Sequence, residues 1–437
     1  MGGRFYGGVH PEYSKGIASA APIRRMPTPE TLIVHFHQNL GAPPRPVIKR
    51  GEEVKKGQLI AEAGGFVSAN VHSPVSGKVK SIGMYPSPVG SESEAAVIVP
   101  DEQQEWAEGI GTERSASEVK RDDIPEMIRD AGIVGMGGAT FPTHVKLMPP
   151  EDKNIDILII NGAECEPYLT ADHRLMLEQG EGILEGAMIF ARAIDARDIV
   201  IAIEKNKPDA IEKMKELVRD RDIRVEAMDV IYPQGAEKQL IYALTRRKVP
   251  AGGLPMDVGA LVQNVGTCNA AYKAASRGIP LIERVVTVTG SAIKNPGNVL
   301  VPVGTRFGDI IDFCGGMSDR AAKIISGGPM MGVAQYSLEA SVTKGTSGIV
   351  LLKADEVQQF VNAPCIRCGR CLEVCPMRLN PSALSIFAER TDYESTGEYN
   401  VMDCIECGCC AYVCPSRRPM VHHFRKAKAE IRKKDRG

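Results

Sequence analysis

CIRCGRCLEVCP (Cys365–Pro376) and CIECGCCAYVCP (Cys404–Pro415) share one spacing, C-x2-C-x2-C-x3-C-P. With this spacing, three thiolates of one loop bind a [4Fe–4S] cluster and the fourth cysteine binds the other cluster. Two four-cysteine zinc sites are the alternative, but zinc loops use separated C-x2-C pairs and have no use for a third cysteine. We therefore expect two clusters, held by Cys365, Cys368, Cys371 with Cys414 and by Cys404, Cys407, Cys410 with Cys375.

Composition limits the remaining possibilities. The chain has 437 residues, 43% of them hydrophobic, which is enough for several domains. A formal net charge of −1 gives no electrostatic reason to expect nucleic acid. Eight of the twelve cysteines lie in the two runs, so we expect a reducing, cytosolic setting rather than disulfides. No stretch reaches the ~18 apolar residues of a membrane span, so any membrane association should be peripheral.

Residues 31–115, which follow an N-terminal arm over 1–30, predict a small β-barrel because short valine- and glycine-rich runs alternate with turn signals. GEEVKKGQLIAEA (Gly51–Ala63) and SPVSGKV (Ser73–Val79) resemble the two halves of the lipoyl/biotinyl carrier domain. Carriers attach their prosthetic group to a hairpin lysine, yet residues 57–73 contain none. We expect a lipoyl-like barrel, a barrel-sandwich hybrid, with a structural role.

Residues 116–280 predict an α/β domain with a parallel sheet covered on both faces, because buried strands alternate with helices. Expected strands include 155–162, 198–204 and 223–230, and residues 173–195 read as one long helix. Ligands of such sheets bind in the loops at the carboxyl ends of the strands.

The first such loop is GIVGMGGATFPT, which contains Gly135, Gly137 and Gly138. A dinucleotide fingerprint would need a strand before these glycines and a helix directly after them. A helix precedes them and Pro142 follows, so that reading is weak. Glycines still allow backbone amides to approach a phosphate closely, and an ordinary glycine-rich turn is the alternative. Three later loops carry Asn161, Glu164 and Glu166, then Gly235 and Glu237, then Asn264.

Four segments, GMGGATFPTHVK, NGAECEP, GAEKQL and QNVGT, resemble in order four loops of the flavin-binding, NADH-oxidising subunit of respiratory complex I and its hydrogenase relatives. The resemblance implies FMN and places flavin contacts on Gly135, Gly137, Gly138, Lys146, Asn161, Glu164, Gly235, Glu237 and Asn264. It places nicotinamide nucleotide contacts on Glu166 and Phe141, and catalytic roles on Lys146, Glu164 and Glu166. This chain departs from the family at Met136, Ala163 and Gly266, where the family has Arg, Asp and Glu.

Residues 281–345 resemble the soluble-ligand-binding β-grasp (SLBB) module, and residues 346–437 would form the ferredoxin-like two-cluster domain with a basic tail. Together with the GGVHP arm (Gly7–Pro11), this order is similar to the RnfC family, which belongs to the Rnf ion-pumping NAD:ferredoxin oxidoreductases. The resemblance implies electron exchange between NAD(H), FMN and the clusters on the cytoplasmic side of the cell membrane. It also implies other Rnf-type membrane and iron–sulfur subunits as partners, ferredoxin indirectly, and no nucleic acid.

Two alternatives stay open: a soluble cobalamin reductase built from the same modules, and an electron-relay scaffold without flavin. The two cluster loops also differ in charge, since Arg367 and Arg370 lie in the first and Glu406 in the second. Nearby cations favour the reduced form of a cluster and anions oppose it. We therefore expect the first cluster to be the more easily reduced.

Overall fold

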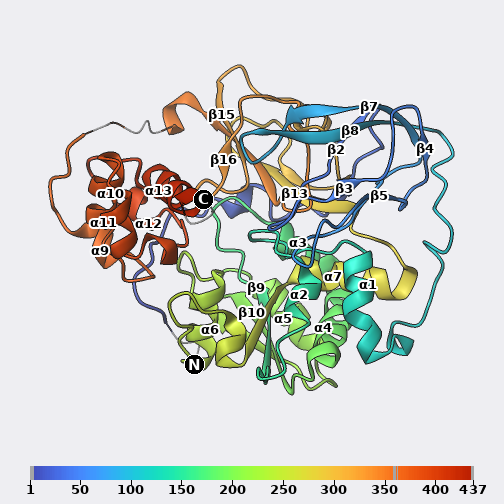
Figure 1. Ribbon diagram of the computed structural model, residues 1–437, viewed down its shortest axis with the longest axis horizontal. Coiled ribbons are helices and arrows are strands. Elements are labelled where there is room, and N and C mark those ends of the chain that lie inside the picture. The colour runs from blue at the N-terminus through green and yellow to red at the C-terminus, as the bar shows by residue number, and fades with distance from the viewer. Residues whose placement is uncertain (1–3, 358–360, 362, 435–437) are drawn as a thin grey trace.

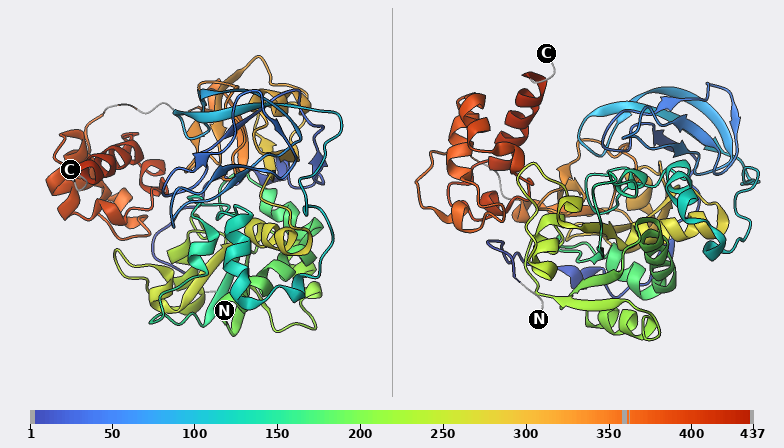
Figure 2. Two further views of the ribbon diagram at one scale, coloured as in Figure 1. Left: turned by 45° about the vertical axis from the view of Figure 1, so that its right-hand side comes forward. Right: turned by 60° about the horizontal axis from the view of Figure 1, so that its bottom comes forward.

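The computed structural model describes residues 4–357, 361 and 363–434, so the ends of the predicted arm (1–3) and basic tail (435–437) lie outside the described residues. Figure 1 shows the barrel above the α/β domain, the β-grasp sheet beside the barrel, and the cysteine-rich domain at one edge. In Figure 2 the cysteine-rich domain forms a separate lobe.

The N-terminal barrel consists of two small sheets, as the turn-punctuated sequence predicts. Their strand orders are β2-β8-β7-β4 and β3-β5-β6. Apolar side chains of both sheets, among them Val34, Ile60 and Ile98, form one buried core. The strands are β2 (Leu32–His35), β3 (Arg45–Pro46), β4 (Glu53–Val54), β5 (Leu59–Glu62), β6 (Val71–His72), β7 (Gly77–Pro86) and β8 (Glu92–Pro100).

The second domain confirms the predicted parallel sheet, with strand order β11-β10-β9-β12. Side chains alternate between two cores, because Leu158 and Ile160 of β9 pack on one face and Ile157 and Ile159 on the other. Helices therefore cover both faces. The strands are β9 (Ile157–Gly162), β10 (Asp198–Glu204), β11 (Arg224–Met228) and β12 (Ala260–Asn264). The helices are α1 (Ile124–Asp130), α2 (Thr143–Lys146), α3 (Ala171–Glu178), α4 (Gly180–Ile194), α5 (Pro208–Leu217), α6 (Glu237–Thr245) and α7 (Val265–Arg277).

The single helix predicted over residues 173–195 is wrong, because α3 and α4 are separate helices that meet at Gln179. Gln179 has φ −130° and ψ 28°, outside the helical region. Gly180 and Gly182 follow it at positions where a Cβ would lie 2.5 Å from Leu217 and from Asn269 respectively. These glycines allow α4 to pack closely against its neighbours, and the change of helix direction accompanies that packing.

The β-grasp module has a six-stranded sheet with order β1-β14-β13-β17-β15-β16 and one covering helix, α8 (Phe307–Phe313). Two strands come from outside residues 281–345, the predicted extent of the module. β1 (Arg24–Arg25) belongs to the N-terminal arm, and β17 (Gly348–Lys353) lies beyond residue 345 in the centre of the sheet. The other strands are β13 (Glu283–Thr289), β14 (Gly297–Pro302), β15 (Ala321–Ser326) and β16 (Val333–Ala334).

The C-terminal domain is helical and small. Its helices are α9 (Arg370–Glu373), α10 (Pro381–Glu389), α11 (Tyr393–Glu398), α12 (Cys409–Tyr412) and α13 (Met420–Lys434). The described part of the basic tail forms the last turns of α13. Short 3-10 helices occur along the whole chain, at Lys15–Ile17, Ala116–Glu118, Arg121–Asp123, Pro255–Val258, Ala354–Glu356 and Val401–Asp403. Within the described residues, no helix has both the length and the apolar character needed to span a membrane.

His72 of the barrel gives a prediction about pH. Burial lowers the pKa of His72 from 6.5 to about 3, so the folded barrel holds it neutral where the unfolded chain is protonated. Below pH 6.5 the unfolded state therefore binds more protons, and stability should fall by about 2 kcal/mol at pH 5. Hydrogen exchange of the barrel strands at pH 7 and pH 5 measures this loss. His72→Gln should reduce it, and the same change at exposed His37 should not.

Candidate flavin and iron–sulfur sites

The four predicted loops meet at one edge of the parallel sheet. The side-chain amide of Asn161, at the end of β9, donates to the carbonyl of Gly235 at 2.8 Å. A Cβ on Gly137 would lie 3.0 Å from the side-chain nitrogen of Asn264, at the end of β12. Lys146 of α2 forms an ion pair of 2.6 Å with Glu237 at the start of α6. Segments that are distant in the sequence thus contribute to one site.

The glycine-rich loop offers space for a phosphate at this edge. Gly137 has φ 77°, a left-handed conformation that favours glycine. A Cβ built on Gly138 meets no atom within 4 Å, so the space over this residue is open. Backbone amides with no side chain over them can bind phosphate oxygens closely. The loop therefore fits the phosphate of FMN.

Lys146 and Glu237 complete the charged part of the site. The Lys146 ammonium also donates to the carbonyl of Val262 at 3.1 Å, so three elements hold it in position. Both side chains retain exposure, 22% for Lys146 and 36% for Glu237. The lysine supplies a positive charge next to the predicted phosphate site, and Glu237 orients it.

Glu164 is buried behind this edge, near the start of α3. Its carboxylate accepts the backbone amide of Asp172 at 3.0 Å and that of His173 at 3.4 Å. Burial raises the pKa of Glu164, the carboxylate of Asp172 adds to the increase, and the ammonium of Lys15 opposes it. Glu164 is placed to hold the first turn of α3 and, through Asp172, the side chain of Asn264, which donates to Asp172 at 2.7 Å.

Glu166 and Phe141, the predicted nicotinamide contacts, lie in different surroundings. Both oxygens of Glu166 accept backbone amides of the β-grasp module, from Met330 at 3.1 Å and Met331 at 2.8 Å. Burial raises the pKa of Glu166 to about 7. Phe141 accepts the amide of Gly135 at 2.8 Å through its carbonyl, which closes the glycine-rich loop. Their contacts with a nicotinamide stay predictions.

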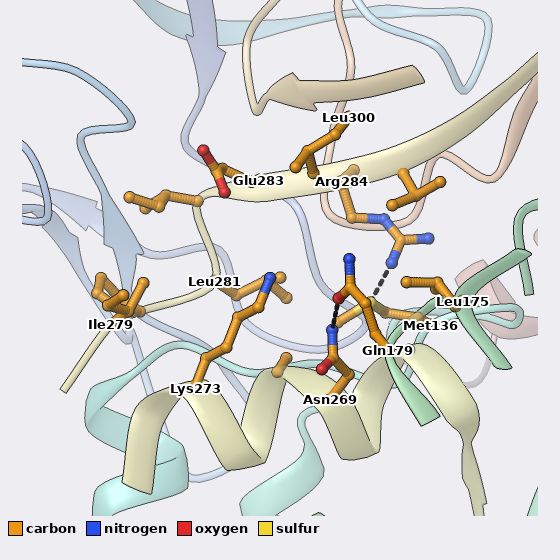
Figure 3. Close-up of a pocket in the computed structure, with 15 residues that line it drawn as sticks. Met136, Leu175, Gln179, Asn269, Lys273, Ile279, Leu281, Glu283, Arg284 and Leu300 are labelled. Carbon is orange, nitrogen blue, oxygen red and sulfur yellow. Dashed lines mark hydrogen bonds between the residues drawn. The ribbon is translucent and has the colours of Figure 1, made fainter. Parts of the chain in front are cut away.

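A small cavity of about 40 Å³ lies behind the glycine-rich loop, between α7 and β13 (Figure 3). Arg284 of β13 extends into it and contacts the sulfur of Met136. Its guanidinium also donates to the carbonyl of Thr346 at 3.2 and 3.3 Å. Burial lowers the pKa of Arg284 to about 10. A cation from the β-grasp module thus lies beside Met136, the position at which the resembled family has an arginine.

The two cysteine runs fold into matching loops. Arg367 and Glu406 have φ 54° and 57°, and Gly369 and Gly408 have φ 80° and 81°. In each loop the amide two residues after the first cysteine donates to its sulfur at 3.4 Å, from Arg367 to Cys365 and from Glu406 to Cys404. Amides directed at the sulfur are the interactions that stabilise thiolate ligands of iron.

The structure brings the cysteines together in the predicted combinations. One cavity is lined by Cys365, Cys368, Cys371 and Cys414, and another by Cys375, Cys404, Cys407 and Cys410. None of the cysteines forms a disulfide within the described residues. Four thiols at each cavity are the donors that a [4Fe–4S] cluster requires.

Cys409 also borders the second cavity, but it packs against the α/β domain. It is fully buried with Tyr232, Val9 and Cys407, and its thiol lies 3.9 Å from the carbonyl of Tyr232. The hydroxyl of Tyr232 donates to the carbonyl of Cys407 at 2.7 Å. Tyr232 precedes Gly235 by three residues, so the second cysteine loop contacts a loop of the predicted flavin site directly.

The GGVHP arm reinforces this contact. Gly8 donates its amide to the carbonyl of Val374 at 2.9 Å, and Val9 pairs with Tyr232 through two backbone hydrogen bonds of 2.8 and 2.9 Å. The arm thus lies between Cys375 and the α/β domain. Gly7 has φ 73°, and its Cβ would lie 2.7 Å from the Val374 carbonyl oxygen.

Gly7→Val should therefore separate the arm from the cysteine-rich domain. The left-handed backbone and the steric overlap together cost about 1–3 kcal/mol. We expect faster hydrogen exchange of the amides of Val9 and Tyr232. Gly16→Val is the control, since a Cβ there meets no atom within 4 Å. Equal exchange in both variants would show that the arm does not hold the domains together.

Several residues of the site were not predicted. Lys15 donates to the carbonyls of Glu166 and Leu169 at 2.8 and 2.6 Å, and Arg284 comes from a different module. Asp172 and Tyr232 lie outside the four motifs. Their roles depend on tertiary contacts between distant segments, and no local pattern indicates them.

Comparisons with known proteins agree with this architecture. Family models match at residues 3–103 (RnfC barrel sandwich hybrid domain), 128–273 (Nuo51 FMN-binding domain), 285–334 (SLBB domain) and 364–417 (4Fe-4S dicluster domain). The predicted fold class is thereby confirmed. The H2-reduced state of an NAD+-reducing [NiFe]-hydrogenase has a similar fold, with TM-score 0.50 and 19% identity over 73% of this chain and 64% of that one.

Two curated relatives match nearly the whole chain, and both are RnfC-type subunits of ferredoxin:NAD(+) oxidoreductase complexes. The one from the proton-translocating complex of Clostridium ljungdahlii is 53% identical, over 98% of this chain and 94% of that protein. The one from the Na(+)-translocating complex of Acetobacterium woodii is 44% identical, over 98% and 97%. This chain therefore belongs to the RnfC family of the ion-translocating ferredoxin:NAD(+) oxidoreductase complexes.

Proposed function

We propose that the chain binds FMN and two [4Fe–4S] clusters and exchanges electrons with NAD(H) as the peripheral RnfC-type subunit of such a complex. One observation carries the proposal. The second cysteine loop contacts the predicted flavin site through the 2.7 Å hydrogen bond between Tyr232 and Cys407. Cofactors bound at these two places would be neighbours, as electron transfer requires.

Each part of the chain has a separate task in this function. Bound FMN supplies hydride transfer with the nicotinamide and single-electron transfer to the clusters. The amides of Gly135, Gly137 and Gly138 hold the phosphate, and Lys146 balances its charge. Asn161, Gly235, Glu237 and Asn264 shape the pocket of the ring. Glu164 holds α3 in place, and Glu166 and Phe141 border the nicotinamide.

The proposal orders the two clusters. Cys375, Cys404, Cys407 and Cys410 would hold the cluster next to the flavin, because both segments that supply them contact the α/β domain. Gln239 of α6 donates to the carbonyl of Pro376 at 3.4 Å, directly after Cys375. Cys365, Cys368, Cys371 and Cys414 would hold the outer cluster.

An anaerobic absorbance spectrum before and after addition of NADH tests this function. The expected result is bleaching of the flavin band together with the broad absorbance of the clusters. Denaturation should release FMN, which a scaffold without flavin would not contain. Bleaching of the flavin alone would show that the two sites are not connected.

Membrane fractionation tests the remaining part of the proposal. The chain should sediment with membranes through partner subunits on the cytoplasmic side and be released by salt, because surface ion pairs are screened. A soluble cobalamin reductase would remain in the supernatant at every salt concentration and would reduce cobalamin with NADH.

A further inference from the structure

We propose that the first cysteine loop, Cys365–Arg370, is the docking surface for an acidic iron–sulfur protein that exchanges electrons with the outer cluster. The inference rests on the proposed function, because it concerns how electrons enter or leave the two-cluster domain. It assigns a surface, and the kind of partner that the surface fits.

The position of the loop is the first argument. The second loop is covered by the α/β domain and the β-grasp module: Cys407 and Cys409 are 7% and 0% exposed, and a Cβ on Gly408 would lie 2.7 Å from the carbonyl oxygen of Met330. The first loop has no such cover, because Cys368 and its neighbours are exposed. Across the described ranges, no hydrogen bond or ion pair joins residues 365–371 to another domain. An approaching protein therefore reaches the outer cluster more closely than the inner one.

Figure 1 shows the same arrangement. α12, which follows the second loop, lies nearer to the other domains than α9, which follows the first. The cysteine-rich lobe extends away from the rest of the molecule in Figure 2, so a partner has room beside it.

The chemistry of the loop is the second argument. Ile366 is 66% exposed and lies between the cysteines, with exposed Arg367 and Arg370 beside it. Arg417, also exposed, follows Ser416, which lines the same cavity. Exposed Glu373 is the nearest acid along the chain after these arginines. An apolar centre with surrounding guanidinium groups is typical of a protein interface, and it favours a partner with carboxylates.

The ion pairs of the domain strengthen this argument. Glu406, which corresponds to Arg367 in the second loop, pairs with Arg425 and Lys428 at 2.9 Å each. Among the described residues, no ion pair involves Arg367, Arg370 or Arg417. The inner loop thus satisfies its charge internally, while the outer loop presents unpaired cations to solvent. Long-range attraction of an acidic partner would accelerate its association.

The test uses the full-length chain with its cofactors and a purified acidic two-[4Fe–4S] ferredoxin. Stopped-flow mixing of reduced ferredoxin with the oxidised chain gives a second-order rate at low and high salt. For the wild type this rate should fall with salt. For Arg367→Glu/Arg370→Glu we expect a rate at least about tenfold lower at low salt, which rises as salt screens the repulsion. A shift of cluster potential alone would not reverse the salt dependence.

Three further variants complete the experiment. Arg367→Lys/Arg370→Lys keeps the charge and should react within about threefold of the wild type. Arg432→Glu/Lys433→Glu makes the same change in charge on α13, about 18 Å along the helix axis from Met420, which lines the cavity of the first run, and should have no effect. Arg417→Glu lies outside the cysteine run and should slow the reaction even if the double variant loses its cluster.

The outcomes separate this proposal from the function on which it rests. If NADH fails to reduce the clusters of the wild type, the proposed function is wrong. If NADH reduces the clusters of every variant and charge reversal leaves the ferredoxin rate and its salt dependence unchanged, the docking surface is wrong. Loss of binding to phosphatidylserine vesicles, with an unchanged ferredoxin rate, would instead assign the loop to a membrane surface.

Discussion

Gly138→Trp should yield a protein that has lost its FMN and keeps both clusters. A Cβ at Gly138 meets no protein atom within 4 Å, so the indole would occupy the open space over the loop without disturbing the fold. Hydrogen bonds to a charged acceptor contribute about 1.5–3 kcal/mol each. Losing even one of the amide contacts with the phosphate would weaken flavin binding by about tenfold or more.

Flavin released per protein, with iron content measured on the same sample, gives the result. Gly16→Trp is the control, since that exposed glycine also has open space around its Cβ and lies outside the loop. Stoichiometric FMN in Gly138→Trp would mean that the phosphate binds elsewhere.

Cys410→Ser and Cys409→Ser should differ sharply in iron content. Cys410 lines the second cavity at the spacing of the motif, whereas Cys409 is enclosed by Tyr232 and Val9. We expect Cys410→Ser to fall from about eight irons to about four, or to convert its cluster to a smaller one. Cys409→Ser should keep about eight, because its thiol serves in packing.

Iron analysis and low-temperature EPR of the dithionite-reduced proteins distinguish the two variants. Cys268→Ser, a change of another fully buried cysteine in the α/β domain, controls for the cost of a buried hydroxyl. Loss of a cluster in Cys409→Ser with retention in Cys410→Ser would reverse the ligand assignment.

Most of the fold could be predicted because it depends on local patterns. The alternation of Ile157 to Ile160 indicates a strand buried on both faces, and the cysteine spacing specifies two loops of the same conformation. The break at Gln179 could not be predicted, since the apolar periodicity continues across it. β17 falls outside the predicted bounds of the module because its pairing with β13 and β15 is a long-range contact.

The charge difference between the cluster loops shows the same limit. The acid in the second loop, Glu406, is the reason for expecting that cluster to be the harder to reduce. The structure places Arg425 and Lys428 on that carboxylate, and Lys428 also donates to the carbonyl of Cys404. The local charge of the second loop is thus no longer negative, and the electrostatic basis for the expected order of potentials is lost.

The order of electron transfer is the central claim, and removal of one cluster at a time tests it most directly. Cys368→Ser should lose the outer cluster, and Cys404→Ser the inner one. The remaining cluster of each variant is first identified by EPR after reduction with dithionite. Addition of NADH should then rapidly reduce the cluster that remains in Cys368→Ser and leave the one in Cys404→Ser oxidised. Equally rapid reduction in both variants, or reduction only in Cys404→Ser, would contradict the account.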